Sequence, residues 1–255
     1  MDEYLRFIQS TLSPNTYRTY KAALESWGNR PLSGVAGYIR SQAGKSRRTI
    51  KQRLVVVAGY YAWKGEDVSS LARVIRNYKA EETLQPCPSK AEIESILDGI
   101  TNLKYRAIYL LAAECGLRVS EIISIRLSDY DGDSVILRQT KNGKDYTVKL
   151  TTRARNALYI YLEAYSPTAF LFEGRSGKLD VSAVQRYVKE HMVAAGCGQY
   201  HMHSLRRYYA NQLASAGVSP YVLQRCMRHT CLQSTQKYLN VGNEEVSAAV
   251  TEVFG

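Results

Sequence analysis

Four polar side chains towards the C-terminal end of the sequence are of the types that phosphoryl transfer requires. They are His203, Arg206, His229 and Tyr238. His203 and Arg206 are three positions apart, so on a helix they share one face and can reach the same anion. Such chemistry needs cations and hydrogen-bonding groups around the non-bridging oxygens, and a nucleophile held in line. Each residue taken singly is better explained as a buried or solvated side chain, but the set favours phosphoryl transfer.

Two segments nearer the middle of the sequence complete this set. Residues 116–121 are Gly-Leu-Arg-Val-Ser-Glu, and residues 140–144 are Thr-Lys-Asn-Gly-Lys. With His-x-Leu-Arg at residues 203–206, then His229 and a tyrosine nine residues later, they resemble the active-site signature of the tyrosine recombinases, the phage integrase family. The resemblance is to Xer-like and integrase members. It covers residues 89–238 by motif and the N-terminal part by architecture only.

The resemblance implies a site-specific DNA recombinase that needs no metal and no other cofactor. Tyr238 would attack a DNA phosphodiester and form a covalent 3′-phosphotyrosyl intermediate that conserves the bond energy. Arg118 and Arg206 would clamp the non-bridging oxygens, because a planar guanidinium fork fits phosphate well. His203 would take part in proton transfer with the nucleophile, and His229 would hydrogen-bond to the scissile phosphate.

A lysine on a β-hairpin is the expected general acid. Residues 134–139 and 145–150 are rich in β-formers and flank an Asn-Gly pair, which is a strong hairpin signal. The family places a lysine on such a hairpin, where it protonates the leaving 5′ oxygen, and Lys141 aligns with it. Lys144 is close enough to be an alternative.

Two charged residues beside the predicted site are expected to modify it. Glu121 lies three residues after Arg118 and can hold its guanidinium in place, although an ordinary surface ion pair is the alternative. The family commonly has glycine before the second histidine, whereas this sequence has Arg228. Arg228 would add a cation near the phosphate, and we interpret it as tolerated because His229 keeps its spacing to Tyr238.

The elements that position these residues are predicted to be mainly helical. The fold class is mainly α with a small β-hairpin: a helical, SAM-like core-binding domain over residues 1–80 and a mixed α/β catalytic domain over residues 89–255. Residues 81–88, which include Pro86-Cys87-Pro88, are the expected linker. Helices are expected over residues 2–10, from 14, 33–41, from 46, 69–78, 89–99, 103–115, 119–125, 151–165, 180–195, 202–216, 219–227, from 233, and 244–254, with a short extended piece over 169–172.

Charge favours a polyanionic partner, with double-stranded DNA as the default. The net charge is +11, and residues 1–80 contain 14 Lys or Arg against 5 Asp or Glu. A solvated helix face is the alternative for any single basic residue, but a phosphate-contacting helix suits the chemistry of the other half better. The candidate DNA contacts are Lys45, Arg47, Arg48, Lys51, Arg53, Lys144 and Arg207.

Several classes of protein are excluded or disfavoured. No run of about 18 apolar residues indicates a membrane span, and the first residues lack the form of a secretory signal. The five cysteines are scattered without zinc-site spacing, so neither a metal site nor a disulfide is expected. The expected setting is the cytoplasm and nucleoid, with a prokaryotic, viral or plasmid gene.

The tail beyond Tyr238 bears on assembly. Its apolar stripe, Val246, Ala249, Val250 and Val253, predicts a short helix that docks on a neighbouring protomer or on its own domain. The family resemblance implies a homotetramer on two duplexes with a Holliday-junction intermediate and a specific core site, and a monomer in the absence of DNA. The alternatives are a type IB topoisomerase, a hairpin telomere resolvase, which is usually larger, or a non-catalytic DNA-binding protein of the same fold.

Overall fold

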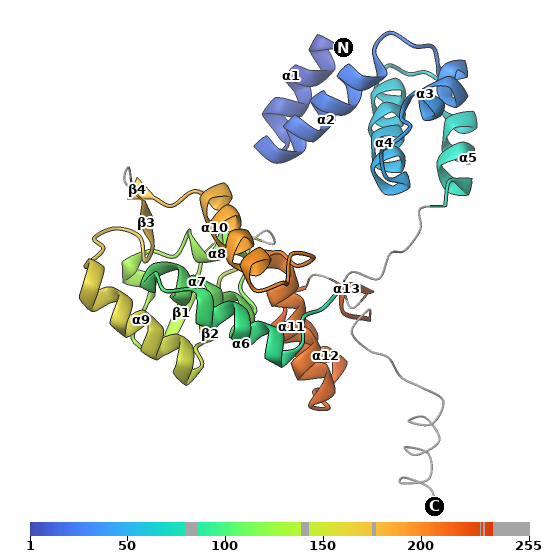
Figure 1. Cartoon of the computed structure of the whole chain (residues 1–255). Coiled ribbons are helices and arrows are strands. Elements are labelled where there is room, and N and C mark those ends of the chain that lie inside the picture. Colours follow the sequence, from blue (N-terminus) through green and yellow to red (C-terminus); the bar gives the residue numbers. More distant parts are fainter. Residues whose placement is uncertain (80–85, 139–142, 175–176, 230, 232, 237–255) are drawn as a thin grey trace, which may run out of the picture. The chain divides into compact units, whose positions relative to one another are not determined.

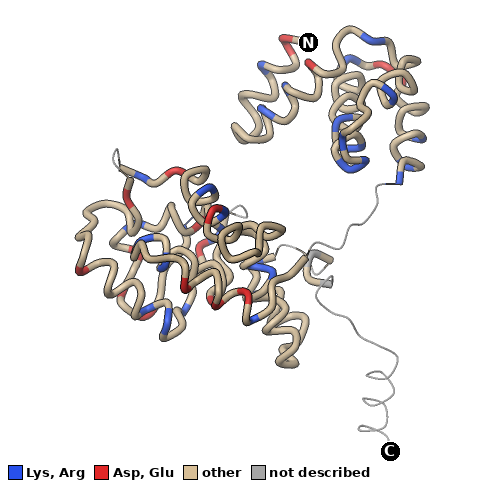
Figure 2. Tube along the Cα trace, viewed as in Figure 1, with Lys and Arg blue, Asp and Glu red and all other residues tan. Residues whose placement is uncertain are grey.

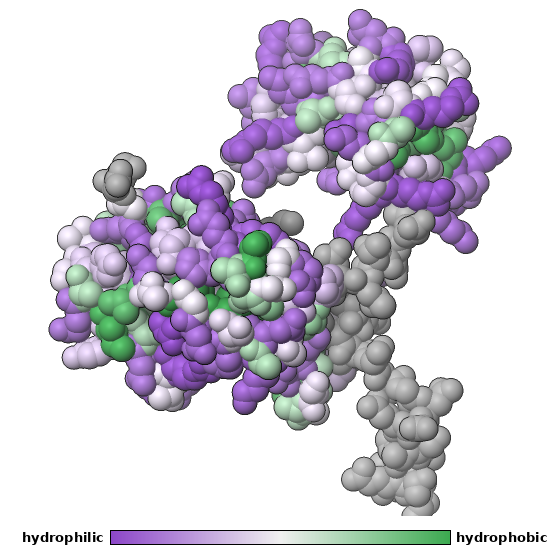
Figure 3. All heavy atoms as spheres, viewed as in Figure 1, coloured by the Kyte–Doolittle hydropathy of each residue, from purple (hydrophilic) through white to green (hydrophobic). Residues whose placement is uncertain are grey.

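The computed structural model divides into two compact units, Met1–Leu84 and Gln85–Gly255 (Figure 1). It describes residues 1–79, 86–138, 143–174, 177–229, 231 and 233–236. The predicted C-terminal helix over residues 244–254 and most of the predicted linker lie outside the described residues. On the face drawn in Figure 3, the surface of each unit is mostly hydrophilic and includes small apolar areas.

The first unit is a helical bundle whose helix starts follow local capping rules. Ser13 accepts a hydrogen bond from the backbone N–H of Thr16, and Pro14 occupies the first helical position. Ser46 caps α4, Arg47–Trp63, in the same way, accepting from Thr49 N at 3.1 Å. The elements are α1 Asp2–Thr11, α2 Pro14–Trp27, the 3-10 helix η1 Leu32–Gly34, α3 Val35–Ser41, α4 Arg47–Trp63 and α5 Ser69–Asn77.

Trp27 lies at the centre of this unit and is fully buried. Its ring packs against Tyr38 with centroids 4.9 Å apart, and its indole N–H donates to the carbonyl of Arg30 at 2.9 Å. The hydroxyl of Tyr61 donates to the same carbonyl at 2.6 Å. These bonds satisfy the polar atoms of two large aromatic side chains inside the core, as burial requires.

The second unit is built around α7, Leu103–Glu114, which packs against α9, Thr152–Tyr165, and α11, Met202–Ser215. All seven residues from Ala107 to Ala113 are buried, so α7 is apolar on every side, as a central helix must be. The other elements are α6 Lys90–Gly99, α8 Val119–Ile122, the 3-10 helix η2 Leu127–Asp129, β1 Ser134–Leu137, β2 Tyr146–Lys149, α9 Thr152–Tyr165, β3 Glu173–Gly174, β4 Gly177–Lys178, α10 Val181–Ala194, α11 Met202–Ser215, α12 Pro220–Cys226 and α13 Gln233–Gln236.

The predicted hairpin is confirmed in its strands. β1 and β2 pair antiparallel, from Ser134 opposite Lys149 to Leu137 opposite Tyr146. Residues 139–142, between them, lie outside the described part of the chain. The small β3–β4 hairpin was not predicted, because Glu173–Gly174 and Gly177–Lys178 are too short to give a strand pattern.

One helix is shorter than predicted. Residues 119–125 were expected to be helical, but α8 ends at Ile122. Ile125 and Leu127 instead pair with the extended piece near Phe170: Leu171 N donates to the carbonyl of Ile125 at 2.8 Å, and Leu127 N donates to that of Ala169 at 3.0 Å. A tertiary pairing therefore ends a segment whose local pattern favours helix.

Candidate active site

A cavity of about 560 Å³ opens in the second unit beside α8, α10 and α11. Arg118, His203 and Arg206 line it together, although Arg118 lies far from the other two in sequence. Three predicted site residues are thus brought to one place. The complete lining is Leu117, Arg118, Val119, Ser120, Gln185, Lys189, His201, Met202, His203 and Arg206.

Arg118 stands at the start of α8, where Glu121 holds it at both ends. The backbone N–H of Arg118 donates to Oε2 of Glu121 at 2.8 Å, and its Nη1 donates to Oε1 at 2.6 Å. The Arg118 side chain remains 37% exposed, whereas that of Glu121 is 10% exposed. The carboxylate therefore lies on the inner side and the guanidinium on the side that reaches solvent.

Gly116 makes the turn before Arg118 possible. Its φ is +61°, which residues with a side chain rarely adopt, and a Cβ added there would overlap the ring of Tyr209. The chain between α7 and α8 can therefore approach α11 closely only with glycine at this position. The close approach also leaves the carbonyl of Gly116 pointing towards Arg206, which binds it.

Arg206 is 1% exposed, and its guanidinium joins two loops. Nη1 donates to the carbonyl of Gly116 and Nη2 to the carbonyl of Met227. Nη1 also lies 3.7 Å from Oε2 of Glu121. A guanidinium is planar, so these two bonds fix the orientation of its plane.

Arg228 is also buried, and its guanidinium lies against the same group of atoms. Nη2 donates to the carbonyl of Gly116 at 2.8 Å and to Oε2 of Glu121 at 3.1 Å. Nη1 donates to the carbonyl of Cys226 at 3.1 Å. Sequence alone indicated a cation added near the phosphate; the geometry places this cation on the carboxylate of Glu121.

Glu121 is therefore shared by three guanidiniums, those of Arg118, Arg206 and Arg228. Burial opposes ionisation of this carboxyl group. The positive charge of Arg228 and the hydrogen bonds from Arg118 outweigh that effect, so the pKa of Glu121 lies below its usual value. A carboxylate that is ionised at neutral pH offsets part of the positive charge gathered beside the cavity at this point.

The two predicted histidines occupy different surroundings. His203 is exposed and lines the cavity on α11. His229 is half-buried after α12, with its backbone N–H donating to the carbonyl of Gln224 at 3.1 Å. Its Nδ1 lies 3.0 Å from Oγ1 of Thr235, a fully buried residue of α13. His229 thus joins α12 to the short helix that precedes Tyr238 in the sequence.

Sequence reasoning missed three polar residues of the cavity, Gln185, Lys189 and His201. Lys189 donates from Nζ to the carbonyl of Tyr200 at 2.9 Å, which holds its charge beside the start of α11. Partial burial, and then the charges of Lys189 and Arg207, lower the pKa of His201. The only sequence signal was that His201 lies two residues before His203; Lys189 gave none, because its helix comes from a separate segment.

Of the remaining predicted site residues of this unit, two are described by the structure and two are not. Lys141 and Tyr238 lie outside the described residues. Lys144 is exposed just before β2, and Arg207 is half-buried on α11. Within the described ranges, no group of three or more His, Cys, Asp or Glu side chains is arranged to hold a metal ion. No helix among the same residues is long and apolar enough to cross a bilayer.

The predicted basic cluster of the first unit lies at the N-terminal end of α4, where Figure 2 shows a concentration of Lys and Arg. Lys45, Arg47 and Arg48 are exposed there, and Lys51 is half-buried. Arg53 differs from them. Its Nη1 donates to Oγ of Ser26 at 3.0 Å and to the side-chain oxygen of Gln42, so its guanidinium joins neighbouring helices of its own unit.

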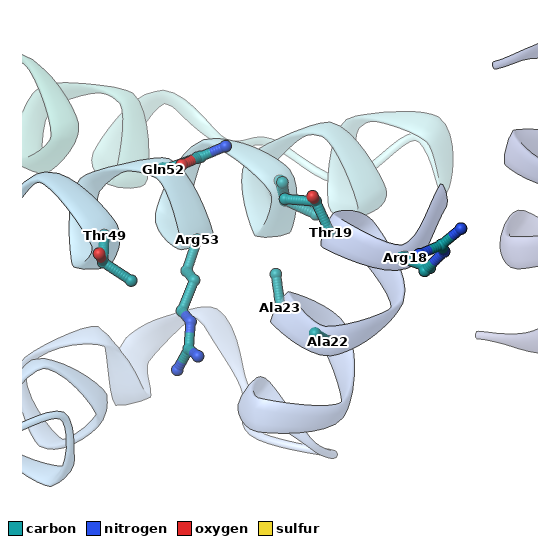
Figure 4. Close-up of a pocket in the computed structure, with 8 residues that line it drawn as sticks. Arg18, Thr19, Ala22, Ala23, Thr49, Gln52 and Arg53 are labelled. Carbon is teal, nitrogen blue, oxygen red and sulfur yellow. The ribbon is translucent and has the colours of Figure 1, made fainter. Parts of the chain in front are cut away.

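A hollow of about 350 Å³ lies between α2 and α4 of the same unit (Figure 4). Arg18 and Thr19 line it from α2, and Thr49 and Gln52 line it from α4. Arg18 was not among the residues singled out from the sequence.

The second unit therefore brings arginine and histidine side chains from separate helices to one cavity. Residues 89–245 match the phage integrase family, so the chain belongs to that family. It is a tyrosine recombinase, an enzyme of site-specific DNA recombination, of the Xer and integrase type.

Relatives and solved structures agree with this membership. The chain is 26% identical over 269 residues to the tyrosine recombinase XerA of Pyrococcus horikoshii, covering 98% of this chain and 92% of the relative. The Tn1549 transposon integrase, solved in complex with transposon right end DNA, superposes with a TM-score of 0.81 at 16% identity, covering 99% of this chain and 98% of that one. A lambda integrase tetramer bound to a Holliday junction gives a TM-score of 0.77 at 16% identity, with 94% and 76% covered.

Proposed function

We propose that this enzyme cuts and rejoins double-stranded DNA at a specific core site through a covalent 3′-phosphotyrosyl intermediate and a Holliday junction. The observation that carries the proposal is the cavity in which Arg118, His203 and Arg206 meet. Such a cavity offers a phosphodiester two guanidiniums and an imidazole from fixed helices. Preorganised donors of this kind stabilise the charge that develops on the non-bridging oxygens.

In the proposed cleavage step, side chains of this protein act as the nucleophile and transfer the protons. The phenolate oxygen of Tyr238 forms a bond to phosphorus, and the bond from phosphorus to the 5′ oxygen breaks. His203 takes part in proton transfer with the phenol, and Lys141, or Lys144 in its place, protonates the leaving 5′ oxygen. Arg118 and Arg206 hold the non-bridging oxygens. Attack by a 5′ hydroxyl of the second duplex reverses the step and exchanges strands.

Glu121 and His229 support these groups. Glu121 orients Arg118 through the two hydrogen bonds described above, so its role is that of a positioning residue. His229 hydrogen-bonds to the scissile phosphate in this proposal, while its other ring nitrogen stays near Thr235. That nitrogen fixes the ring orientation and ties it to α13.

In this proposal both units contact DNA, each through its own basic residues. The first unit acts as a core-binding domain through Lys45, Arg47, Arg48 and Lys51, whose positive charges suit phosphates. Arg207 and Lys144 contribute contacts from the catalytic domain. The similarity to the XerA relative, which covers 98% of this chain, supports this division.

Assembly is proposed to be a homotetramer on two duplexes, with a monomer free in solution. The apolar stripe Val246, Ala249, Val250 and Val253 would dock on the next protomer, and a head-to-tail contact closes into a ring at a fixed rotation. The lambda integrase tetramer on a Holliday junction supports this arrangement. We place the enzyme in the cytoplasm, at the nucleoid, since its substrate is DNA.

The direct test is covalent trapping combined with strand exchange. A nicked DNA core site should yield a protein–DNA adduct that survives denaturing gel electrophoresis, and Tyr238→Phe should yield none while binding DNA with nearly unchanged affinity. Two differently labelled duplexes should give recombinant products and a four-way intermediate. Adduct formation by Tyr238→Phe would contradict the assignment of the nucleophile, and relaxation of supercoils without exchange would indicate a topoisomerase.

A further inference from the structure

Arg228 has a backbone conformation that is costly for a residue with a side chain. Its φ is +50°, in the left-handed region, and Ser166 is the only other described non-glycine residue with a positive φ. Glycine would adopt this conformation without strain. The local geometry of the turn therefore disfavours arginine, so the presence of arginine has to be explained by what its side chain contacts.

The side chain of Arg228 connects two loops that are far apart in the sequence. It is 3% exposed, and its Nη2 donates to the Gly116 carbonyl at 2.8 Å and to Oε2 of Glu121 at 3.1 Å. Its Nη1 donates to Cys226 in its own turn at 3.1 Å. One guanidinium thus fixes the turn that leads into His229 against the loop that carries Arg118.

Arg206 makes a second connection between the same two loops. It donates to the carbonyl of Gly116 and to that of Met227, the residue immediately before Arg228. The Gly116 carbonyl therefore accepts from both guanidiniums, one from α11 and one from the turn after α12. This shared acceptor places the backbone of Arg118's loop and of His229's turn in one hydrogen-bonded cluster.

The charge balance of the cluster depends on Glu121. A buried guanidinium is costly without an ionised partner. Glu121 is that partner for Arg228, and the same carboxylate orients Arg118. Moving Arg228 would therefore change the contacts that hold Arg118, with the shared carboxylate as the intermediary.

We infer that Arg228 is a positioning residue of the cleavage site, which sets the place of His229 relative to Arg118 by bridging the Gly116–Glu121 loop and the turn before His229. The inference deepens the proposed function and rests on it. In this role Arg228 touches neither the nucleophile nor the phosphate. It acts through Glu121 and through the Gly116 carbonyl.

Arg228→Gly and Arg228→Asn test this role, because both residues accept a left-handed conformation and both remove the guanidinium. We expect proteins that stay folded at the assay temperature, with a melting temperature lowered by loss of the Gly116 and Glu121 contacts, and with a DNA affinity within about twofold of that of the wild type. Covalent adduct formation should fall by roughly 10- to 100-fold, the size of effect that a misplacement of about 1 Å produces. Wild-type cleavage rates in either variant would overturn the inference.

Ser166→Gly is the matched control. It makes the same backbone change at an exposed position at the end of α9, with no side chain in the cavity. It should leave the cleavage rate unchanged. If Arg228→Gly lost cleavage only in proportion to a lower fraction of folded protein, Arg228 would be a stability residue and the inference would be wrong.

Amide hydrogen exchange provides a readout that does not depend on cleavage. In Arg228→Gly the amides of residues 116–121 should exchange faster, although they lie more than 100 positions away in the sequence. Ser166→Gly should show wild-type exchange there. Unchanged exchange in residues 116–121 would overturn the inference, whereas absence of an adduct from the wild-type protein would count against the proposed function alone.

Discussion

Glu121 binds Arg118 twice, once at the backbone N–H at 2.8 Å and once at the guanidinium at 2.6 Å. The first bond caps α8 and the second sets the direction of the side chain, so a single carboxylate controls both the start of the helix and the cation that it presents. Because Arg206 and Arg228 also lie within ion-pair distance of Glu121, the carboxylate is the common anchor of three cations. Its ionisation is therefore coupled to the geometry of the whole site.

The ionisation of Glu121 predicts a loss of stability in acid. The pKa of Glu121 is lower in the folded chain than in the unfolded chain, where it is about 4.3. The stabilisation is therefore present above that value and is lost as the pH falls through the folded pKa. Chemical denaturation at a series of pH values should show the free energy of unfolding decreasing below about pH 4.3. Glu121→Gln should be less stable at neutral pH and should lose part of this dependence; an unchanged pH profile would contradict the anchoring role.

The two arginines of the cavity should differ in what their loss affects. Arg118→Ala removes a partly exposed side chain and should mainly slow cleavage, by about 2.7–4 kcal/mol in activation free energy if it stabilises the transition state. Arg206→Ala should slow cleavage similarly and also destabilise the fold, because the carbonyl of Met227 loses its donor, at about 1–3 kcal/mol, while the carbonyl of Gly116 keeps Arg228. Single-turnover adduct formation and urea denaturation measure the two effects.

Arg206→Lys is the companion variant. An ammonium cannot reach both carbonyls and a phosphate with the fixed fork of a guanidinium, so lysine should restore neither the cleavage rate nor the full stability. Cleavage at the wild-type rate by Arg206→Lys would show that the planar clamp is not needed.

The general acid can be identified with a modified substrate. Lys141→Ala should fail on an ordinary phosphodiester but recover on DNA with a 5′-bridging sulfur, because a thiolate leaves without a proton. Lys144→Ala is the matched control and should cleave both substrates alike. If the sulfur substrate rescues Lys144→Ala instead, the two lysines have the opposite roles.

The parts of the structure that follow local rules could be predicted from the sequence. Ser89 and Glu92 form the capping box that opens α6, with Ser89 N donating to Glu92 at 2.7 Å and Glu92 N donating to Ser89 at 3.3 Å. Motif spacing also indicated that His203 and Arg206 would share a helix face, and both line the same cavity.

The rest depends on contacts between distant segments. Lys189 joins the cavity from α10 without any motif, and the partners of Arg228 lie more than 100 residues away. A pattern in the sequence identifies a basic residue but does not say whether its side chain faces solvent or its own fold. Arg53 illustrates this, since it was grouped with exposed arginines but is hydrogen-bonded to Ser26.

Arg53 should affect DNA binding differently from the other basic residues of the cluster, because its side chain is bonded within its own unit. Neutralising Arg47, Arg48 and Lys51 together should weaken DNA binding to all sequences and lower the slope of log affinity against log salt by roughly 0.9 units for each phosphate that the protein no longer neutralises.

Arg53→Ala should behave differently: its guanidinium joins Ser26 and Gln42, so the variant should lower the melting temperature of the first unit. Its salt slope should stay close to that of the wild type. Titrations of a labelled duplex at several salt concentrations, with thermal melts of the same proteins, separate the two kinds of arginine. An unchanged slope in the triple variant would place the cluster away from DNA, and a lowered slope in a fully stable Arg53→Ala protein would show that Arg53 leaves its internal partners to bind phosphate.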